Sequence, residues 1–145
     1  MLATNSPTPT GLYTQGSLVP VSVALPQILQ RVMAGQGHAI PGPQAVTALI
    51  DTGAQGCCID HSVAAALGLQ PTRTIQIGSA AGQNPHPVYV VNLALLVNPA
   101  VSFDPWEVIG VDVRGNGIGA LLGRDALARS LFVYNGVLGS WTLAI

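Results

Sequence analysis

The pattern of apolar and polar positions along this chain consists mainly of short apolar segments separated by turns that contain glycine or proline. Such segments predict β-strands at residues 18–25, 46–50, 74–77, 88–97, 106–113 and 118–122. The stretches 131–134 and 139–145, which flank Asn135-Gly136, predict a closing hairpin. Short amphipathic patterns after Pro26 and Ser62 predict two short helices. We therefore expect a mainly β protein with one or two short helices.

The domain organisation follows from length and local composition. A chain of 145 residues is long enough for one domain with a real core. Residues 1–17 are rich in Thr, Pro, Ser and Gly, which predicts a flexible N-terminal arm. The remaining residues 18–145 are expected to form a single domain.

The segment between the strands at 74–77 and 88–97 is about twice as long as an ordinary hairpin loop. It runs from Gly78 to Pro87 and contains small residues. A long loop of this kind is a candidate mobile lid, and a plain surface loop is the alternative.

Charge is unusually sparse in this chain. Only 8% of the residues are charged, Lys is absent, and the formal net charge is −1. Without a basic patch, nucleic acid and anionic membranes are not expected as partners. The chain shows neither a secretory signal pattern nor a bilayer-length apolar run, which favours a cytoplasmic location. So little charge suggests either a surface partly covered by dimerisation or a generally weakly polar surface.

The most distinctive chemistry lies where the strand at 46–50 meets Asp51-Thr52-Gly53-Ala54. A carboxylate at the end of a buried strand is costly unless it is paired, hydrogen-bonded or functional. Asp-Thr-Gly also occurs in ordinary turns, so the segment alone is weakly specific. A second element raises its significance: the apolar strand at 118–122 leads into Gly123-Arg124-Asp125 and then a short helical pattern.

Together these two elements resemble the retropepsin-like aspartic proteases, in particular single-lobe members of the bacterial and retroelement kind. The resemblance covers residues 46–145 and implies a closed or partly open β-barrel with a flap hairpin. It implies catalytic roles for Asp51, Thr52 and Gly53. It implies that substrate is bound by Ala54, Ser79, Ala80, Ala81, Gly82, Leu121 and Leu122. It also implies that the site is structurally supported by Gly123, Arg124 and Asp125. No metal or cofactor is implied.

One position departs from the family pattern. In retroviral members the matching Arg pairs with an Asp two residues after the Gly of the active loop, but this chain has Gln55 there. Asp60 or backbone carbonyls are therefore the alternative partners of Arg124, and a surface Arg without a fixed partner is a further alternative.

The mechanism implied by the resemblance needs two carboxylates, whereas the chain contains one Asp-Thr-Gly. A homodimer with a two-fold axis would place Asp51 opposite its own copy. Two close carboxylates share a proton, so one can activate water while the other protonates the carbonyl of a polypeptide substrate. By resemblance, Thr52 is expected to lock the two loops together.

Two other classes of function are alternatives. A catalytically weak or inactive member of this family could serve as a dimerisation or peptide-binding module. A thiol or metal enzyme could use Cys57, Cys58 and His61. Adjacent cysteines hardly suit a mutual disulfide, and structural zinc normally requires a second pair of ligands. Buried thiols behind the active loop are the simpler interpretation.

Overall fold

The computed structural model describes residues 2–5, 8–97 and 99–145. Its strands are β1 (Leu2–Asn5), β2 (Leu18–Ala24), β3 (Gln44–Ile50), β4 (Cys58–Asp60), β5 (Arg73–Ser79), β6 (Gly82–Leu95), β7 (Val101–Val111), β8 (Ala120–Leu122), β9 (Leu131–Asn135) and β10 (Ser140–Ala144). Its helices are α1 (Pro9–Gln15), α2 (Gln27–Gly35), α3 (His61–Ala66), α4 (Arg124–Leu127) and the short 3₁₀ helix η1 (Arg114–Asn116). The mainly β class with short helices is confirmed, and the described residues contain four α-helices where one or two short helices were expected.

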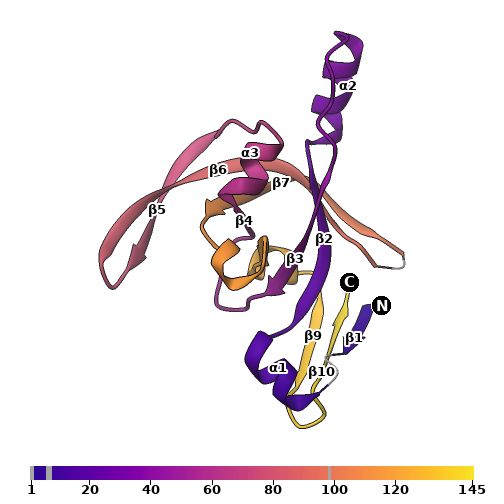
Figure 1. The fold of residues 1–145 in the computed structure, drawn as a ribbon, viewed down its shortest axis with the longest axis vertical. Helices are drawn as coiled ribbons and strands as arrows, with labels where there is room; N and C mark the ends of the chain where they lie inside the picture. Colours follow the sequence, from indigo (N-terminus) through magenta and orange to yellow (C-terminus); the bar gives the residue numbers. More distant parts are fainter. Residues whose placement is uncertain (1, 6–7, 98) are drawn as a thin grey trace.

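Seven strands form one sheet in the order β2-β3-β8-β4-β7-β6-β5. Strand β2 also pairs with β6, so the strands from β2 to β6 close into a ring while β5 stays outside it (Figure 1). Closure removes the free edges of the ring strands, which an open sheet would expose. This arrangement confirms the expected partly open β-barrel.

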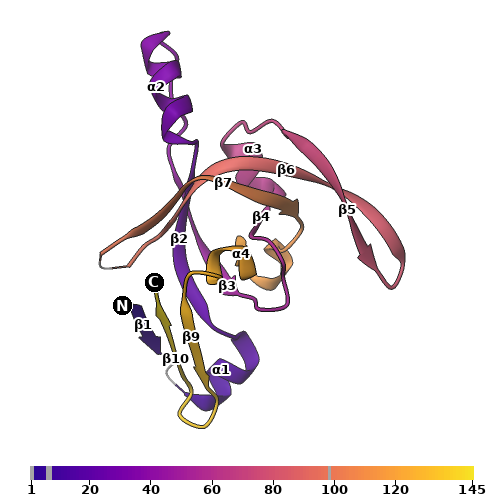
Figure 2. The same ribbon diagram turned by 180° about the vertical axis from the view of Figure 1, so that it is seen from behind.

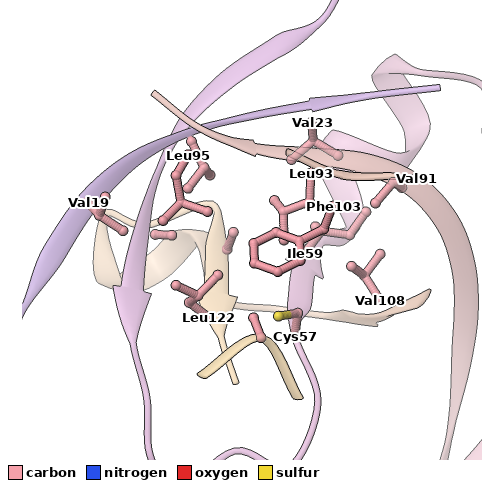
Figure 3. Close-up of a cluster of buried hydrophobic side chains, with 14 of the residues drawn as sticks. Val19, Val23, Cys57, Ile59, Val91, Leu93, Leu95, Phe103, Val108 and Leu122 are labelled. Carbon is pink, nitrogen blue, oxygen red and sulfur yellow. The ribbon is translucent and has the colours of Figure 1, made fainter. Parts of the chain in front are cut away.

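The core lies inside this ring. In β2 the residues Val19, Val21 and Val23 are fully buried and alternate with less buried positions, as a half-buried strand requires. They meet buried side chains from β4, β6, β7 and β8 (Figure 3), among them Ile59, Leu93, Leu95, Val108 and Leu122. Cys57 joins the same cluster, so the segment just after the candidate active loop is anchored in the core.

A second, three-stranded sheet has the order β1-β10-β9. Strand β1 pairs antiparallel with β10, from Leu2 opposite Leu143 to Asn5 opposite Ser140, so the two ends of the chain lie side by side (Figure 2). Phe132 and Trp141 pack against each other with ring centroids 6.2 Å apart. The predicted closing hairpin is therefore present as β9 and β10.

Residues 1–17 contain more regular structure than a loose arm would. Helix α1 begins after Thr8, whose hydroxyl accepts a hydrogen bond from Gly11 N, and Pro9 occupies its first turn. Leu12 is fully buried in the core cluster. Burial of this one leucine outweighs a composition that is typical of loops, whereas the flexibility of the arm stays a prediction.

The expected ten-residue loop at 78–87 is instead most of a long hairpin. Strands β5 and β6 pair from Arg73 opposite Val88 to Ser79 opposite Gly82, which leaves only Ala80 and Ala81 to turn the chain. Val88 O accepts from Thr72 N at 2.8 Å, so Val88 faces the β5 side. Residues 85 and 87, both prolines, face the opposite edge and lose no bond to β5.

Helix α2, predicted from its apolar periodicity, is confirmed and projects from the ring in both views (Figures 1 and 2). It has no buried residue, and Ile28, Leu29 and Val32 are exposed. No helix in the described part of the chain has the length and apolarity to cross a membrane.

Candidate active site

Asp51 directly follows β3, at the point where this strand runs parallel to β8. The register places Ile50 opposite Leu122, and Asp51 N donates to Leu122 O at 3.0 Å. On the other side Ile50 N donates to Ser17 O at 2.9 Å. The strand that delivers Asp51 is thus held on both sides by elements that come from distant parts of the chain.

The Asp51 carboxylate is half-buried and held at one oxygen. Its Oδ1 accepts hydrogen bonds from Gly53 N at 2.8 Å and from Ala54 N at 3.3 Å. A Cβ at position 53 would lie 3.0 Å from this oxygen, so glycine permits the tight turn. Within the described residues Oδ2 makes no hydrogen bond. One oxygen is therefore fixed and the other is available to a ligand.

The turn after β8 clasps this loop through backbone contacts. Arg124 N donates to Ala54 O at 2.9 Å, and Asp125 N donates to Gln55 O at 3.1 Å. At Gly123 an added Cβ would lie 2.5 Å from the carbonyl carbon and oxygen of Gly56, a distance that real side chains do not tolerate. Glycine is required here for close approach of two backbones rather than for an unusual φ.

Arg124 has backbone carbonyls as partners. Its Nη1 donates to Thr52 O at 2.8 Å and to Gly53 O at 3.1 Å. Backbone carbonyl oxygens of the loop thus take the place of the acidic partner that Gln55 cannot provide. Asp60, the other acid considered, has different contacts: it accepts from the backbone of Ser62 and of residues 113 and 114.

Cys57 and Cys58 lie behind the loop as buried free thiols. Cys57 Sγ donates to Asp125 Oδ1 at 3.1 Å and accepts from Gly123 N at 3.4 Å. Burial, reinforced by the charge of Asp125, raises the pKa of Cys57 to about 12 and that of Cys58 to about 11. Both thiols are protonated at neutral pH, which makes them poor nucleophiles. Within the described residues no group of three His, Cys, Asp or Glu side chains is arranged to hold a metal ion.

Two cavities flank the loop. The larger, of about 770 Å³, lies between the loop and strand β5 and is lined by Gly53 and Ala54 as well as by residues of β5. The smaller, of about 400 Å³, is lined by Asp51 and Thr52 on one side and by β9 residues on the other. The Asp-Thr-Gly-Ala loop therefore lies between two cavities that are lined by different residues.

The residues expected to bind substrate are distributed unevenly. Ala54 lines the larger cavity, whereas Ser79, Ala80, Ala81 and Gly82 form the exposed tip of the β5–β6 hairpin. Leu121 is half-buried and Leu122 is buried in the core, and neither lines these two cavities.

Several cavity residues were not expected from the sequence. Ile75 and Ile77 are half-buried and line the larger cavity from β5. The alternation at 74–77 was the signal that could have identified them, since it assigns both to one face of the strand. Glu107, on β7, and Gly56 also line this cavity, and no local pattern indicated either of them.

Residues 38–126 match the family model described as Aspartyl protease. Among solved structures, the solution structure of Simian Foamy Virus (mac) protease is similar with a TM-score of 0.47 and 15% identity, over 77% of this chain and 92% of that one. The crystal structure of a retropepsin-like aspartic protease from Rickettsia conorii is similar with a TM-score of 0.45 and 19% identity, over 88% and 94% of the two chains. No curated protein matches significantly.

Proposed function

This chain belongs to the aspartyl protease family, and we propose that it is an endopeptidase whose active site is completed by a second copy of the same chain. The membership confirms the resemblance to retropepsin-like aspartic proteases. The proposal adds the catalytic residues, the homodimer and the polypeptide substrate.

The observation that carries the proposal is the state of the Asp51 carboxylate. Two backbone N–H groups orient Oδ1, Oδ2 accepts no hydrogen bond from the described residues, and Asp51 lines a cavity of about 400 Å³. A carboxylate held in this way is pre-organised to bind a water molecule. Water activation between carboxylates needs a second one nearby, and each chain contributes a single Asp-Thr-Gly.

In the proposed dimer the two Asp51 side chains share one proton across the two-fold axis. The ionised carboxylate takes a proton from the bound water as its oxygen attacks the scissile carbonyl carbon. The protonated carboxylate gives its proton to the carbonyl oxygen, which forms a neutral tetrahedral intermediate. Collapse of the intermediate breaks the C–N bond: the Asp51 that took the proton from water gives it to the leaving nitrogen, and the other Asp51 takes a proton back from a hydroxyl of the intermediate.

The side chains around the smaller cavity support a second copy at this position. Phe132 and Tyr134 of β9 line it together with Asp51 and Thr52. Strand β9 is an edge of its sheet, and Leu131 and Tyr134 are 65% and 51% exposed. An edge strand with exposed apolar side chains is a surface that proteins normally cover. We place Thr52 at the axis, where its hydroxyl can bond to the partner's loop.

Substrate would lie between the loop and the β5–β6 hairpin. The hairpin tip, Ser79 to Gly82, is exposed and makes only local hydrogen bonds, such as Ala81 N to Ser79 Oγ at 3.3 Å. We propose that this tip closes over an extended peptide as a flap, while Ala54 contacts the substrate from below.

Subunit mixing tests this proposal. Wild-type protein is mixed with an equal amount of Asp51→Asn protein, and exchange is verified by mass spectrometry of isotopically labelled subunits. Random pairing leaves about a quarter of the dimers with two aspartates, so cleavage of a peptide library per total chain should fall to about a quarter of the wild-type value.

A fall to only one half would indicate chains that work alone and would contradict the shared site. Undiminished cleavage by pure Asp51→Asn protein would refute the role of Asp51. A folded dimer that binds peptides without cleaving them would identify the chain as a peptide-binding module.

A further inference from the structure

The larger cavity has apolar walls of the kind that contact an aliphatic side chain. Ile75 and Ile77 of β5 line it, as do Val88 and Ile109 of the adjoining strands. Its volume of about 770 Å³ lies within the range of sites for small ligands. Gly53 and Ala54 also line it, so it adjoins the segment that holds Asp51.

Asp125 and Gly56 both line this cavity. An added Cβ at Gly56 would lie 3.9 Å from Asp125 Oδ2 and 3.4 Å from Ile109 Cδ1, so it would occupy space next to the carboxylate. Asp125 Oδ1 is occupied, since it accepts from Cys57 Sγ at 3.1 Å and Ala126 N at 2.8 Å. Its Oδ2 accepts no hydrogen bond from the described residues.

The other charged side chains of the cavity are already paired or directed elsewhere. Arg73 and Glu107 face each other across the rim, with Nη2 to Oε2 at 2.7 Å and Nε to Oε1 at 3.4 Å. The Arg124 guanidinium is directed at the Thr52 and Gly53 carbonyls. Asp125 is therefore the carboxylate in this cavity that lacks a cationic partner.

The pKa of a thiol in the cavity wall reflects the negative charges nearby. Cys58 lines the cavity, and its pKa is raised to about 11 by burial and then by the charges of Asp125 and Asp51. Both charges act on Cys58 in the same direction. The electrostatic environment next to the loop thus favours a cation.

We propose that this cavity is a substrate subsite for a side chain with a long aliphatic stem and a positively charged end, namely Arg or Lys. The isoleucines contact the stem, and Asp125 Oδ2 accepts a hydrogen bond from the charged end. Gly56 determines this specificity because it leaves Asp125 uncovered. The inference rests on the proposed peptidase function and specifies the class of polypeptide that the site prefers.

The preference is expected to be moderate because the cavity is open to water. A charge-assisted hydrogen bond in such a place corresponds to a preference of roughly five- to tenfold for Arg over norleucine. Glutamate at the same substrate position should be disfavoured by at least as much, since it would face Asp125 with like charge.

The test uses a peptide that the wild-type protein cleaves, identified from a mixed library. The residue at each of the four positions on either side of the cleaved bond is replaced in turn by Arg, norleucine or Glu, and kcat/KM is measured. At one position wild type should prefer Arg over norleucine by about five- to tenfold. Gly56→Ala should reduce this ratio to about one, because the methyl group covers Asp125 with only ordinary van der Waals contacts.

Gly42→Ala is the matched control, since a Cβ there meets nothing within 4 Å and the residue lies outside both cavities. It should keep the wild-type ratio. Asp125→Asn is a second variant that should also lose the Arg preference, with its fold verified by circular dichroism. A wild type with no Arg preference at any position, or a Gly56→Ala variant that keeps one, would overturn the subsite.

Binding separates this inference from the peptidase function. If wild type cleaves no peptide, a library peptide that binds to Asp51→Asn protein is chosen instead. Its positions are replaced in turn by Arg, norleucine or Glu, and binding of these peptides to Asp51→Asn protein is followed by fluorescence anisotropy. Tighter binding of the Arg peptide that Gly56→Ala abolishes supports the subsite although the proposed activity has failed. Equal binding of all three peptides overturns the subsite by itself.

Discussion

Replacement of Asp60 by alanine should lower the free energy of unfolding more than most other single substitutions of polar residues do. Asp60 is only 4% exposed and ends β4, three residues after Cys57. Its carboxylate accepts from Ser62 N and Oγ at 2.9 and 2.5 Å and from Val113 N and Arg114 N, both at 2.9 Å. It therefore joins the start of α3 to the start of η1, which follows β7.

The magnitude follows from the donors that lose their acceptor. Alanine leaves three backbone N–H groups and one hydroxyl without the carboxylate, around a position that is only 4% exposed. We expect a loss of about 3–5 kcal/mol in the free energy of unfolding. For a chain of this size that corresponds to a fall of roughly 10–16 °C in Tm. Asp60→Asn keeps one acceptor oxygen and should lose about half as much.

The pH dependence of the loss has a definite sign. The hydrogen bond from Ser62, with those from the backbone, holds the pKa of Asp60 well below its ordinary value of 3.8. Because the folded state favours the ionised form, the stability from Asp60 is complete above pH 4 and declines as the pH falls further. The gap between wild type and Asp60→Ala should thus be widest near neutral pH and narrow in acid.

The assay is urea unfolding followed by circular dichroism at pH 7 and pH 3, at one protein concentration because a dimer unfolds in a concentration-dependent way. Asp112→Ala is the matched control, since Asp112 lies next to the same segment but is exposed. A loss below about 1 kcal/mol for Asp60→Ala at pH 7, or one equal to that of Asp112→Ala, would refute the reasoning.

Two further predictions concern the loop and its surroundings. Gly123→Ala should lower Tm strongly, because its Cβ would lie 2.5 Å from the Gly56 carbonyl. Gly115→Ala is the control and should leave Tm unchanged, since its Cβ would meet nothing within 4 Å. A Gly123→Ala protein with the wild-type Tm would contradict the close backbone approach. Cys57 and Cys58 should resist iodoacetamide at pH 7.5 in the folded protein, because their pKa values are raised to about 12 and 11, and should react quickly in urea. Mass spectrometry measures the labelling. Rapid labelling of the folded protein with loss of activity would support the thiol-enzyme alternative.

The central part of the site could be predicted because its information is local. An apolar run that ends in Asp51-Thr52-Gly53 and another that ends in Gly123 both indicate a strand followed by a tight turn. The structure pairs these two strands, with Ile50 opposite Leu122. The family match to residues 38–126 agrees with the resemblance that these elements carry.

Features that depend on distant contacts could not be predicted in the same way. The composition of residues 9–15 is typical of a loop, and the helix there is explained by the burial of Leu12 together with the cap that Thr8 provides. Residues 78–87 were expected to form a loop, whereas the spacing of the prolines at 85 and 87 lets both face away from β5 within a continuous hairpin. Asp125 and Gly56 line one cavity together with residues of β5, β6 and β7, and nothing in the local sequence indicates that these segments meet.

The clasp between the loop and the turn after β8 also governs when the site can form during synthesis. Arg124 bonds to Thr52, a residue 72 positions earlier in the chain. When Asp51 has emerged from the ribosome, the chain therefore still lacks Gly123 and Arg124, the residues that fix the conformation of the Asp51 loop. Closing so long a segment is among the slower steps of folding. The proposed peptidase activity should consequently arise only after residues 123 and 124 have been made and have folded against the loop.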